Sequence, residues 1–95
     1  MAEIEVELVR ETDEELEFDV LVREGSSETR HRVELARLDL ERLAGKGESP
    51  QDLVRRCFDF LLAREPKESI LREFDVSVIS RYFPEFEDEI GHQAV

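Results

Sequence analysis

The segment from residue 49 to residue 65 constrains the fold most, because it predicts a helix with an unusually wide apolar face. At about 100° per residue, its apolar side chains spread over roughly 200° of the helix circumference. A helix lying on a single surface needs an apolar stripe of only about 100°. Ser49 as N-cap, Pro50 at the first helical position and Asp52 near the positive end of the helix dipole mark its start. We therefore expect a central helix of about residues 50–64 that is covered on two flanks. Its apolar face comprises Leu53, Val54, Cys57, Phe58, Phe60, Leu61 and Leu62.

Three segments in the first third of the chain predict a β-meander. Apolar and charged side chains alternate along residues 3–8, 16–23 and 29–35. This period of two is typical of antiparallel strands with one buried face. We expect a three-stranded antiparallel β-meander over residues 1–37, with its apolar face against the central helix.

The predicted register of the second and third strands pairs Arg23 with Glu28. This pairing aligns all the inward-facing side chains, whereas a slip of one residue would turn them outward. It points His31 toward the core and places Asp19 opposite Arg32, a favourable pair.

The first hairpin predicts a row of carboxylates that oppose one another. A five-residue loop would place Leu8 opposite Leu16 on the inner face. On the outer face, Glu7 would then face Glu17, and Glu5 would face Asp19. Like charges directly opposed destabilise a sheet. The row is therefore either offset by arginines of the third strand or used to bind a positively charged partner.

The second half of the chain predicts three to four helices packed on one face of the sheet. A short helix starts at Asp39 and ends at Gly45, and Pro66 breaks the central helix and opens a new one with Ile70, Leu71 and Phe74 inward. Residues 76–83 suit a helix or a short strand, and we assign a helix because no hairpin partner is present. The fold class is α+β in a single domain, residues 1–95, with a helical part over 38–90 and a frayed tail over 91–95.

The charge balance restricts the classes of partner. The net charge is −12 over 95 residues. Such a chain repels nucleic acids and anionic membranes, and it favours solubility or a basic protein partner. No targeting segment and no apolar run long enough to cross a membrane is present. The single cysteine, Cys57, excludes an internal disulfide and fits a reducing compartment, so we expect a cytoplasmic protein.

Catalytic and metal-binding motifs are missing from the sequence. His31 is interpreted as a core histidine, and the position of Cys57 on an apolar face would raise the pKa of its thiol. A zinc site would need four Cys or His ligands in paired spacings. The acidic cluster Glu85, Glu87, Asp88 and Glu89 lacks the alternating ligands and the glycine of a calcium loop. We expect no enzyme activity, no cofactor and no metal.

Two resemblances concern the second half of the chain. The phrases "LVRRCFDFLLARE" and "PKESILREFDVSVISRYFPEFEDEI", within residues 53–90, resemble the C-terminal half of a family of small prokaryotic proteins without an assigned function. That resemblance implies a bacterial or archaeal protein and a helix at residues 76–83. The phrases "DVS" and "VISRYF" are similar to the turn and recognition helix of bacterial helix-turn-helix repressors, although the spacing between them is about three residues too short.

The function class that these observations favour is a non-enzymatic protein-interaction module. Its predicted binding residues form the acidic row of the sheet and would dock a basic protein or peptide: Glu3, Glu5, Glu7, Glu17 and Asp19. The alternative is an antitoxin-like or helix-turn-helix-like regulator, and an enzyme ranks third. Phe60, Leu62 and Phe86 leave homodimerisation open as a further possibility.

Overall fold

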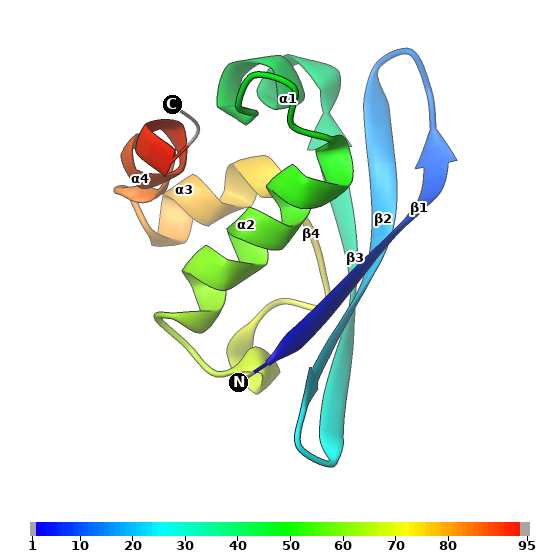
Figure 1. Ribbon diagram of the computed structural model, residues 1–95, viewed down its shortest axis with the longest axis vertical. Helices are drawn as coiled ribbons and strands as arrows, with labels where there is room; N and C mark the ends of the chain where they lie inside the picture. The colour runs from blue at the N-terminus through cyan, green and yellow to red at the C-terminus, as the bar shows by residue number, and fades with distance from the viewer. Residues whose placement is uncertain (1, 94–95) are drawn as a thin grey trace.

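The computed structural model describes residues 2–93 and has the predicted α+β architecture. A twisted sheet forms one layer, and all helices lie on one of its faces (Figure 1). The strand order is β1-β2-β3-β4, so the sheet has four strands and the predicted number of three was wrong. The first three strands are antiparallel, as predicted, and β4 runs parallel to β3. The strands are β1 (Glu3–Glu11), β2 (Glu15–Glu24), β3 (Ser27–Ala36) and β4 (Glu73–Asp75).

The fourth strand replaces the helix predicted after Pro66. A single 3₁₀ turn follows the proline, and the chain then runs extended along β3. The backbone N–H of Arg32 donates to the carbonyl of Arg72 over 2.7 Å, and His31 Nδ1 lies 2.8 Å from the carbonyl oxygen of Leu71. The first bond satisfies a backbone N–H at the edge of β3, and the second holds the side chain of His31. The pairing of β4 with β3, some forty residues earlier in the chain, has therefore outweighed the helical spacing of the apolar residues after Pro66.

The predicted register of the second hairpin is confirmed along its whole length. Arg23 lies opposite Glu28, Val20 opposite His31, and Leu16 opposite Leu35.

The predicted register of the first hairpin was wrong. Glu7 lies opposite Asp19 rather than Glu17, and Glu5 lies opposite Leu21 rather than Asp19. The pairing continues closer to the turn than expected, as far as Glu11 and Leu16, and an irregularity between Leu8 and Arg10 inserts an extra residue into β1. The connection is correspondingly short. In it, the hydroxyl oxygen of Thr12 accepts hydrogen bonds from the N–H groups of Glu14 and Glu15 at 3.2 and 3.1 Å.

The central helix begins as predicted and ends two residues early. The Ser49 hydroxyl oxygen accepts from the N–H of Asp52 over 3.1 Å. Asp39 does not cap the preceding helix, which starts at Arg37, and it instead forms an ion pair with Arg42 inside that helix. Residues 76–82 are helical, and the last helix extends into the predicted frayed tail, of which residues 94 and 95 lie outside the described part. The helical elements are α1 (Arg37–Leu43), α2 (Pro50–Leu62), η1 (Lys67–Ser69), η2 (Val76–Val78), α3 (Ile79–Tyr82) and α4 (Phe86–Gln93).

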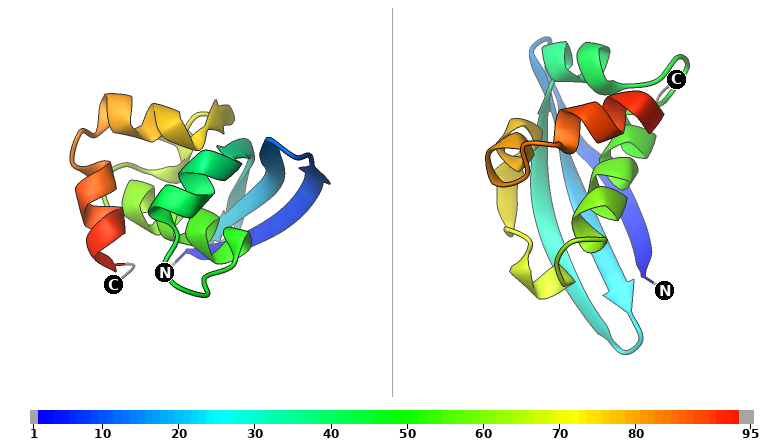
Figure 2. Two further views of the ribbon diagram at one scale, coloured as in Figure 1. Left: turned by 90° about the horizontal axis from the view of Figure 1, so that it is seen from above. Right: turned by 90° about the vertical axis from the view of Figure 1, so that its left-hand side faces the viewer.

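Helix α2 is covered on two flanks. On one side, Phe58 lies fully buried beneath the sheet, with its ring centroid 5.3 Å from that of His31 on β3 and 6.0 Å from that of Phe74 on β4. On the other side, the Phe60 ring meets the edge of Phe86 at 5.1 Å, and Figure 2 shows α3 and α4 on this side of α2. Phe60 and Phe86 are only 5% and 1% exposed, so they do not form the self-association patch suggested by the sequence.

We predict that Phe58→Asp or Leu53→Asp abolishes folding. Both side chains are fully buried, and a carboxylate there would cost about 5 kcal/mol or more, comparable with a total stability of roughly 5 to 15 kcal/mol. Circular dichroism during urea titration would measure the loss. Asp59→Ala, at an exposed position of the same helix, is the control and should change the free energy of unfolding by less than about 0.5 kcal/mol. A cooperative transition in Phe58→Asp at the wild-type midpoint would contradict the prediction.

Candidate functional site

The face of the sheet opposite the helices carries most of the candidate residues, and we call it the outer face (Figure 2). The strand registers place ten carboxylates on this face against four arginines, Arg10, Arg23, Arg30 and Arg32. The excess of negative charge is therefore built into the sheet itself. The carboxylates are Glu3, Glu5 and Glu7 on β1, Glu15, Glu17 and Asp19 on β2, Glu28 and Glu34 on β3, and Glu73 and Asp75 on β4.

Two arginines offset four of the five carboxylates predicted to bind a partner. Arg23 lies 3.6 Å from Glu3 and 3.4 Å from Glu5. Arg32 contacts Glu17 and lies 2.5 Å from Asp19, and both carboxylates contribute to raising the pKa of its guanidinium. Both guanidinium groups are accessible to solvent, so these ion pairs contribute little to stability.

Glu7 is the predicted residue that keeps an unpaired charge. Within residues 2–93 no cationic side chain lies in ion-pair distance of it, and it faces Asp19 across the strand pair. The opposition of carboxylates expected from the sequence therefore exists, although between a different pair of residues.

A hollow of about 570 Å³ opens on the outer face beside β1, β2 and β3. Carboxylates of β1 and β2 line it together with arginines, and Asp19 and Arg32 form an ion pair within this lining, while Leu21 contributes apolar surface. A bound segment would thus meet three predicted carboxylates and three arginines in one depression. The charged lining residues are Glu5, Glu7, Asp19, Arg30, Arg32 and Arg72.

A second group of acidic residues was missed by the sequence reasoning. Glu34 lies opposite Glu17 on β2 and opposite Asp75 on β4. Burial raises the pKa of Glu34, and the neighbouring carboxylates, Glu15 first, raise it further. The outward position of Glu34 followed from the alternation of the third strand. Glu73 and Asp75 could not be placed on this face without knowledge of β4.

His31 has a structural role. A carbonyl oxygen only accepts hydrogen bonds, so Nδ1 of His31 carries a proton and donates it to Leu71. Nε2 of the neutral ring then accepts from the Thr29 hydroxyl at 2.8 Å. Burial lowers the pKa of His31, which favours this neutral form.

Cys57 has none of the properties of a nucleophile. The thiol is buried on α2, and burial raises its pKa to about 12. A thiolate, which is the reactive species, is therefore strongly disfavoured at neutral pH.

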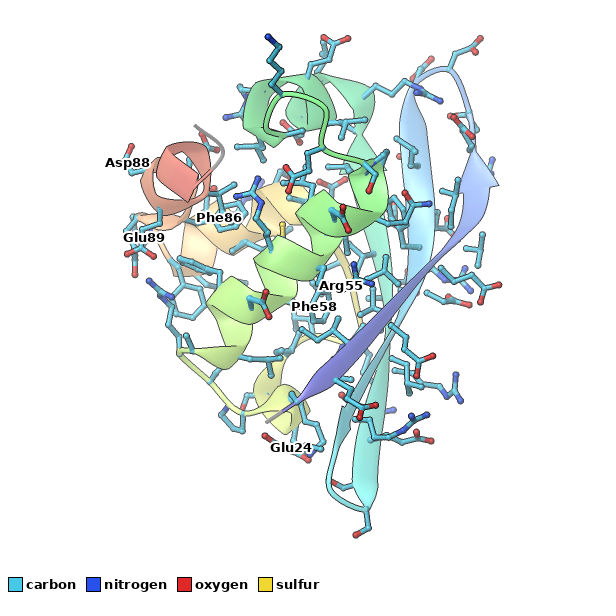
Figure 3. All side chains as sticks on the ribbon, viewed as in Figure 1. Glu24, Arg55, Phe58, Phe86, Asp88 and Glu89 are labelled. Atoms are coloured by element: carbon cyan, nitrogen blue, oxygen red, sulfur yellow. The ribbon has the colours of Figure 1, made fainter. Side chains whose placement is uncertain are left out.

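Three of the four residues of the acidic cluster near the C-terminus form ion pairs within the molecule. Arg64 bonds to Glu85 and Glu89, and Arg42 bonds to Glu87. Figure 3 shows Asp88 and Glu89 on the side of α4 that points away from the sheet. Across the described side chains, no cluster of three or more His, Cys, Asp or Glu residues has the arrangement of a metal site.

A smaller apolar hollow of about 270 Å³ lies between the end of α2 and α3. Leu71 and Tyr82, 46% and 65% exposed, contribute to its lining, and burial raises the pKa of Glu65 at the same place. The segment similar to a helix-turn-helix lies here. Its first part is strand β4, and α3 has only four residues, so the segment lacks the pair of helices that this motif uses.

Comparisons of the chain with protein families, curated proteins and solved structures found no match. Between residues 2 and 93, no helix combines the length and the apolar character needed to cross a bilayer.

We predict that Glu34→Gln stabilises the protein at neutral pH. The substitution removes one charge from a group of carboxylates, and the gain should be on the order of 0.5 kcal/mol in the free energy of unfolding. Because the pKa of Glu34 is raised in the folded protein, the gain should shrink as acid protonates the wild-type side chain. Urea unfolding at several pH values measures both effects. Glu41→Gln, the same charge change on exposed α1, is the control, and an equal gain in this control would show that the cluster has no specific effect.

We also predict that His31 makes the fold sensitive to mild acid. The folded pKa of His31 is lowered from its ordinary value of 6.5, so between about pH 7.5 and about pH 5.5, on either side of that value, the unfolded chain binds more protons than the folded protein. The free energy of unfolding should therefore fall as the pH falls through this window. In His31→Gln the fall should be smaller, because glutamine does not titrate. Denaturant midpoints at the two pH values test this, and identical pH dependence in both proteins would refute it.

Proposed function

We propose that this protein is a non-enzymatic interaction module whose outer face binds a basic segment of a partner protein. The observation that carries the proposal is the excess of carboxylates on the strands of the outer face, ten against four arginines. The hollow of about 570 Å³ on this face is lined by three of these carboxylates and by three arginines. The proposed contact residues from the sequence are Glu3, Glu5, Glu7, Glu17 and Asp19. We add Glu34 and Glu73 to them because they share that face.

The physical basis is the cost of keeping these charges together. Glu7 opposes Asp19, and Glu34 opposes both Glu17 and Asp75. Each such opposition destabilises the sheet by a few tenths of a kcal/mol. A partner carrying lysine or arginine would remove this repulsion, and the free energy recovered would add to the binding energy. The same negative field would accelerate the approach of a basic partner and repel nucleic acids.

The other functional classes have less support. A nucleic-acid-binding regulator would need a cationic surface, and the outer face has the opposite charge. An enzyme would need titratable groups placed together in a cleft, whereas His31 and Cys57 are buried and occupied in packing. The cytoplasmic location and the prokaryotic origin remain part of the proposal, the former because a free buried thiol suits a reducing compartment.

Reversal of three unpaired outer-face charges is expected to abolish binding. Within residues 2–93, Glu7, Glu34 and Glu73 form no ion pair, so Glu7→Lys, Glu34→Lys and Glu73→Lys together change the face without breaking one. Pull-down from the native host, followed by mass spectrometry, should recover a basic partner with the wild-type protein and not with this triple variant. Recovery should also fall steeply with salt.

A matched control separates the outer face from net charge. Glu41→Lys, Asp59→Lys and Asp88→Lys produce the same change in net charge at exposed positions of α1, α2 and α4. This control should retain the partner. Equal loss in both triple variants would mean that only net charge matters, and retention in both would place the binding site elsewhere. Unfolding curves of both variants exclude loss of structure as the cause.

A further inference from the structure

Strand β1 forms an open edge of the sheet. It is the first strand in the order β1-β2-β3-β4, so β2 pairs with only one of its sides. Figure 1 views the molecule with β1 crossing in front of β2 and β3, and in Figure 2 no other element lies beyond it. The opposite edge, β4, has only three residues, whereas β1 has nine. The longer edge is therefore the one with room for an additional strand.

One contact shows which residues of β1 direct their backbone N–H and C=O groups away from β2. Arg55 on α2, which is labelled in Figure 3, donates through Nε to the carbonyl oxygen of Ile4 over 3.4 Å, so this carbonyl points away from β2. Along an antiparallel pair, residues alternate between pointing toward the neighbouring strand and pointing away from it. Val6 and Leu8 lie two and four residues after Ile4, so by this alternation their N–H and C=O groups also point away from β2. Glu5 and Glu7 then form the hydrogen-bonded pairs with β2.

Two features limit the length of the open edge. At one end, Arg55 occupies the carbonyl of Ile4. At the other end, the irregularity between Leu8 and Arg10 interrupts the regular pattern. The N–H and C=O groups of Val6 and Leu8 lie between these limits, which is the length of one short peptide strand.

The side chains along the edge specify the chemistry of an added strand. On the inner face Ile4, Val6 and Leu8 pack against the core and are only half-buried. On the outer face Glu5 and Glu7 are exposed, with Arg23 as the cation near Glu5. A strand lying beside β1 would meet apolar side chains on one face and carboxylates on the other. Its best sequence therefore alternates apolar with basic residues.

A second copy of this chain does not have that sequence. If two β1 strands paired antiparallel around a two-fold axis with their faces matched, an axis at residue 4, 5, 6 or 7 would place a glutamate opposite a glutamate. For example, an axis at Val6 sets Glu5 against Glu7 of the other copy. Like charges directly opposed destabilise such a pair, so self-association at this edge is disfavoured.

We infer that β1 binds an extended segment of a partner protein, with alternating basic and apolar residues, as an additional antiparallel strand of the sheet. This inference rests on the proposed function and adds the geometry of binding. The partner's apolar residues lie opposite Val6 and Leu8 and exchange backbone hydrogen bonds with them. Its basic side chains reach Glu5 and Glu7 on the outer face. Strand addition of this kind takes its affinity from the backbone and its selectivity from the alternating side chains.

Backbone methylation of a peptide provides a direct test. The probe is a short acetylated and amidated peptide that alternates lysine and valine. In antiparallel pairing, the valines opposite Val6 and Leu8 direct their N–H groups at β1, and the lysines direct theirs away. Methylation of the valine nitrogens therefore removes the donors that β1 needs. Methylation of the backbone nitrogens of the lysines adds the same number of methyl groups on the edge of the peptide that faces away from β1, and it leaves the charge unchanged.

We expect the unmodified and the lysine-methylated peptides to bind. The affinity of the valine-methylated peptide should be lower by a factor of about ten or more. Calorimetry at low salt measures the affinities. Hydrogen exchange followed by NMR should show slower exchange of the Val6 and Leu8 amides with the unmodified peptide, while the Glu5 and Glu7 amides, already paired with β2, should change little.

The remaining outcomes separate this inference from the proposed function. If all three peptides bind equally, and the triple variant at Glu7, Glu34 and Glu73 binds none of them, the outer face binds basic segments but no strand is added. In that case the inference is overturned and the proposed function stands. Weaker binding of the lysine-methylated peptide alone would also overturn antiparallel addition. If no peptide binds, the inference fails, and the pull-down with the two triple variants decides the proposed function separately.

Discussion

Burial of helix α2 on two sides is the constraint on which the rest of the structure depends. Phe58 on one flank requires the sheet, and Phe60 on the other requires the chain's last third. The polypeptide leaving α2 must therefore return across the molecule after Pro66. Because this return passes the open side of β3, it supplies the backbone partners that β3 lacks, and β4 results. The same path brings Glu73 and Asp75 to the outer face. The charge of the candidate binding surface is thus a consequence of how the interior is packed.

Elements determined by contacts between residues close in the sequence could be predicted, whereas elements determined by contacts between distant residues could not. The hairpin of β2 and β3 could be aligned from the sequence because its inward residues match in the observed register and its turn is short. The first hairpin could not be aligned, because its connection is shorter than five residues and a residue is inserted near Val9. Together these displace the pairing by two residues while the alternation of Ile4, Val6 and Leu8 stays the same. Strand β4 was missed because it pairs with β3, some forty residues earlier in the chain, and no local pattern encodes that pairing. The same limit applies to the site: Glu7 and Asp19 could be named from alternation, whereas the neighbours of Glu34 depend on β4.

The repulsion between charges on the outer face is too weak to prevent folding, so the face keeps its negative charge in the folded protein. Exposed carboxylates that oppose one another cost a few tenths of a kcal/mol per pair, whereas the interior packing contributes much larger amounts. Arg23 and Arg32, each bonded to two or more carboxylates, offset part of this repulsion. A sheet of this kind folds with its negative charge retained. Evolution can then alter individual outer-face residues with little effect on the core.

The buried thiol of Cys57 has a practical consequence. Its sulfur lies on α2 between the two layers that hold the molecule together, and it is the chain's single cysteine. An alkylating reagent can reach it only when those layers separate, so the rate of modification at fixed pH reports how often the interior opens. Mass spectrometry of the alkylated protein can therefore measure transient opening of the interior in the wild-type sequence, without an engineered cysteine.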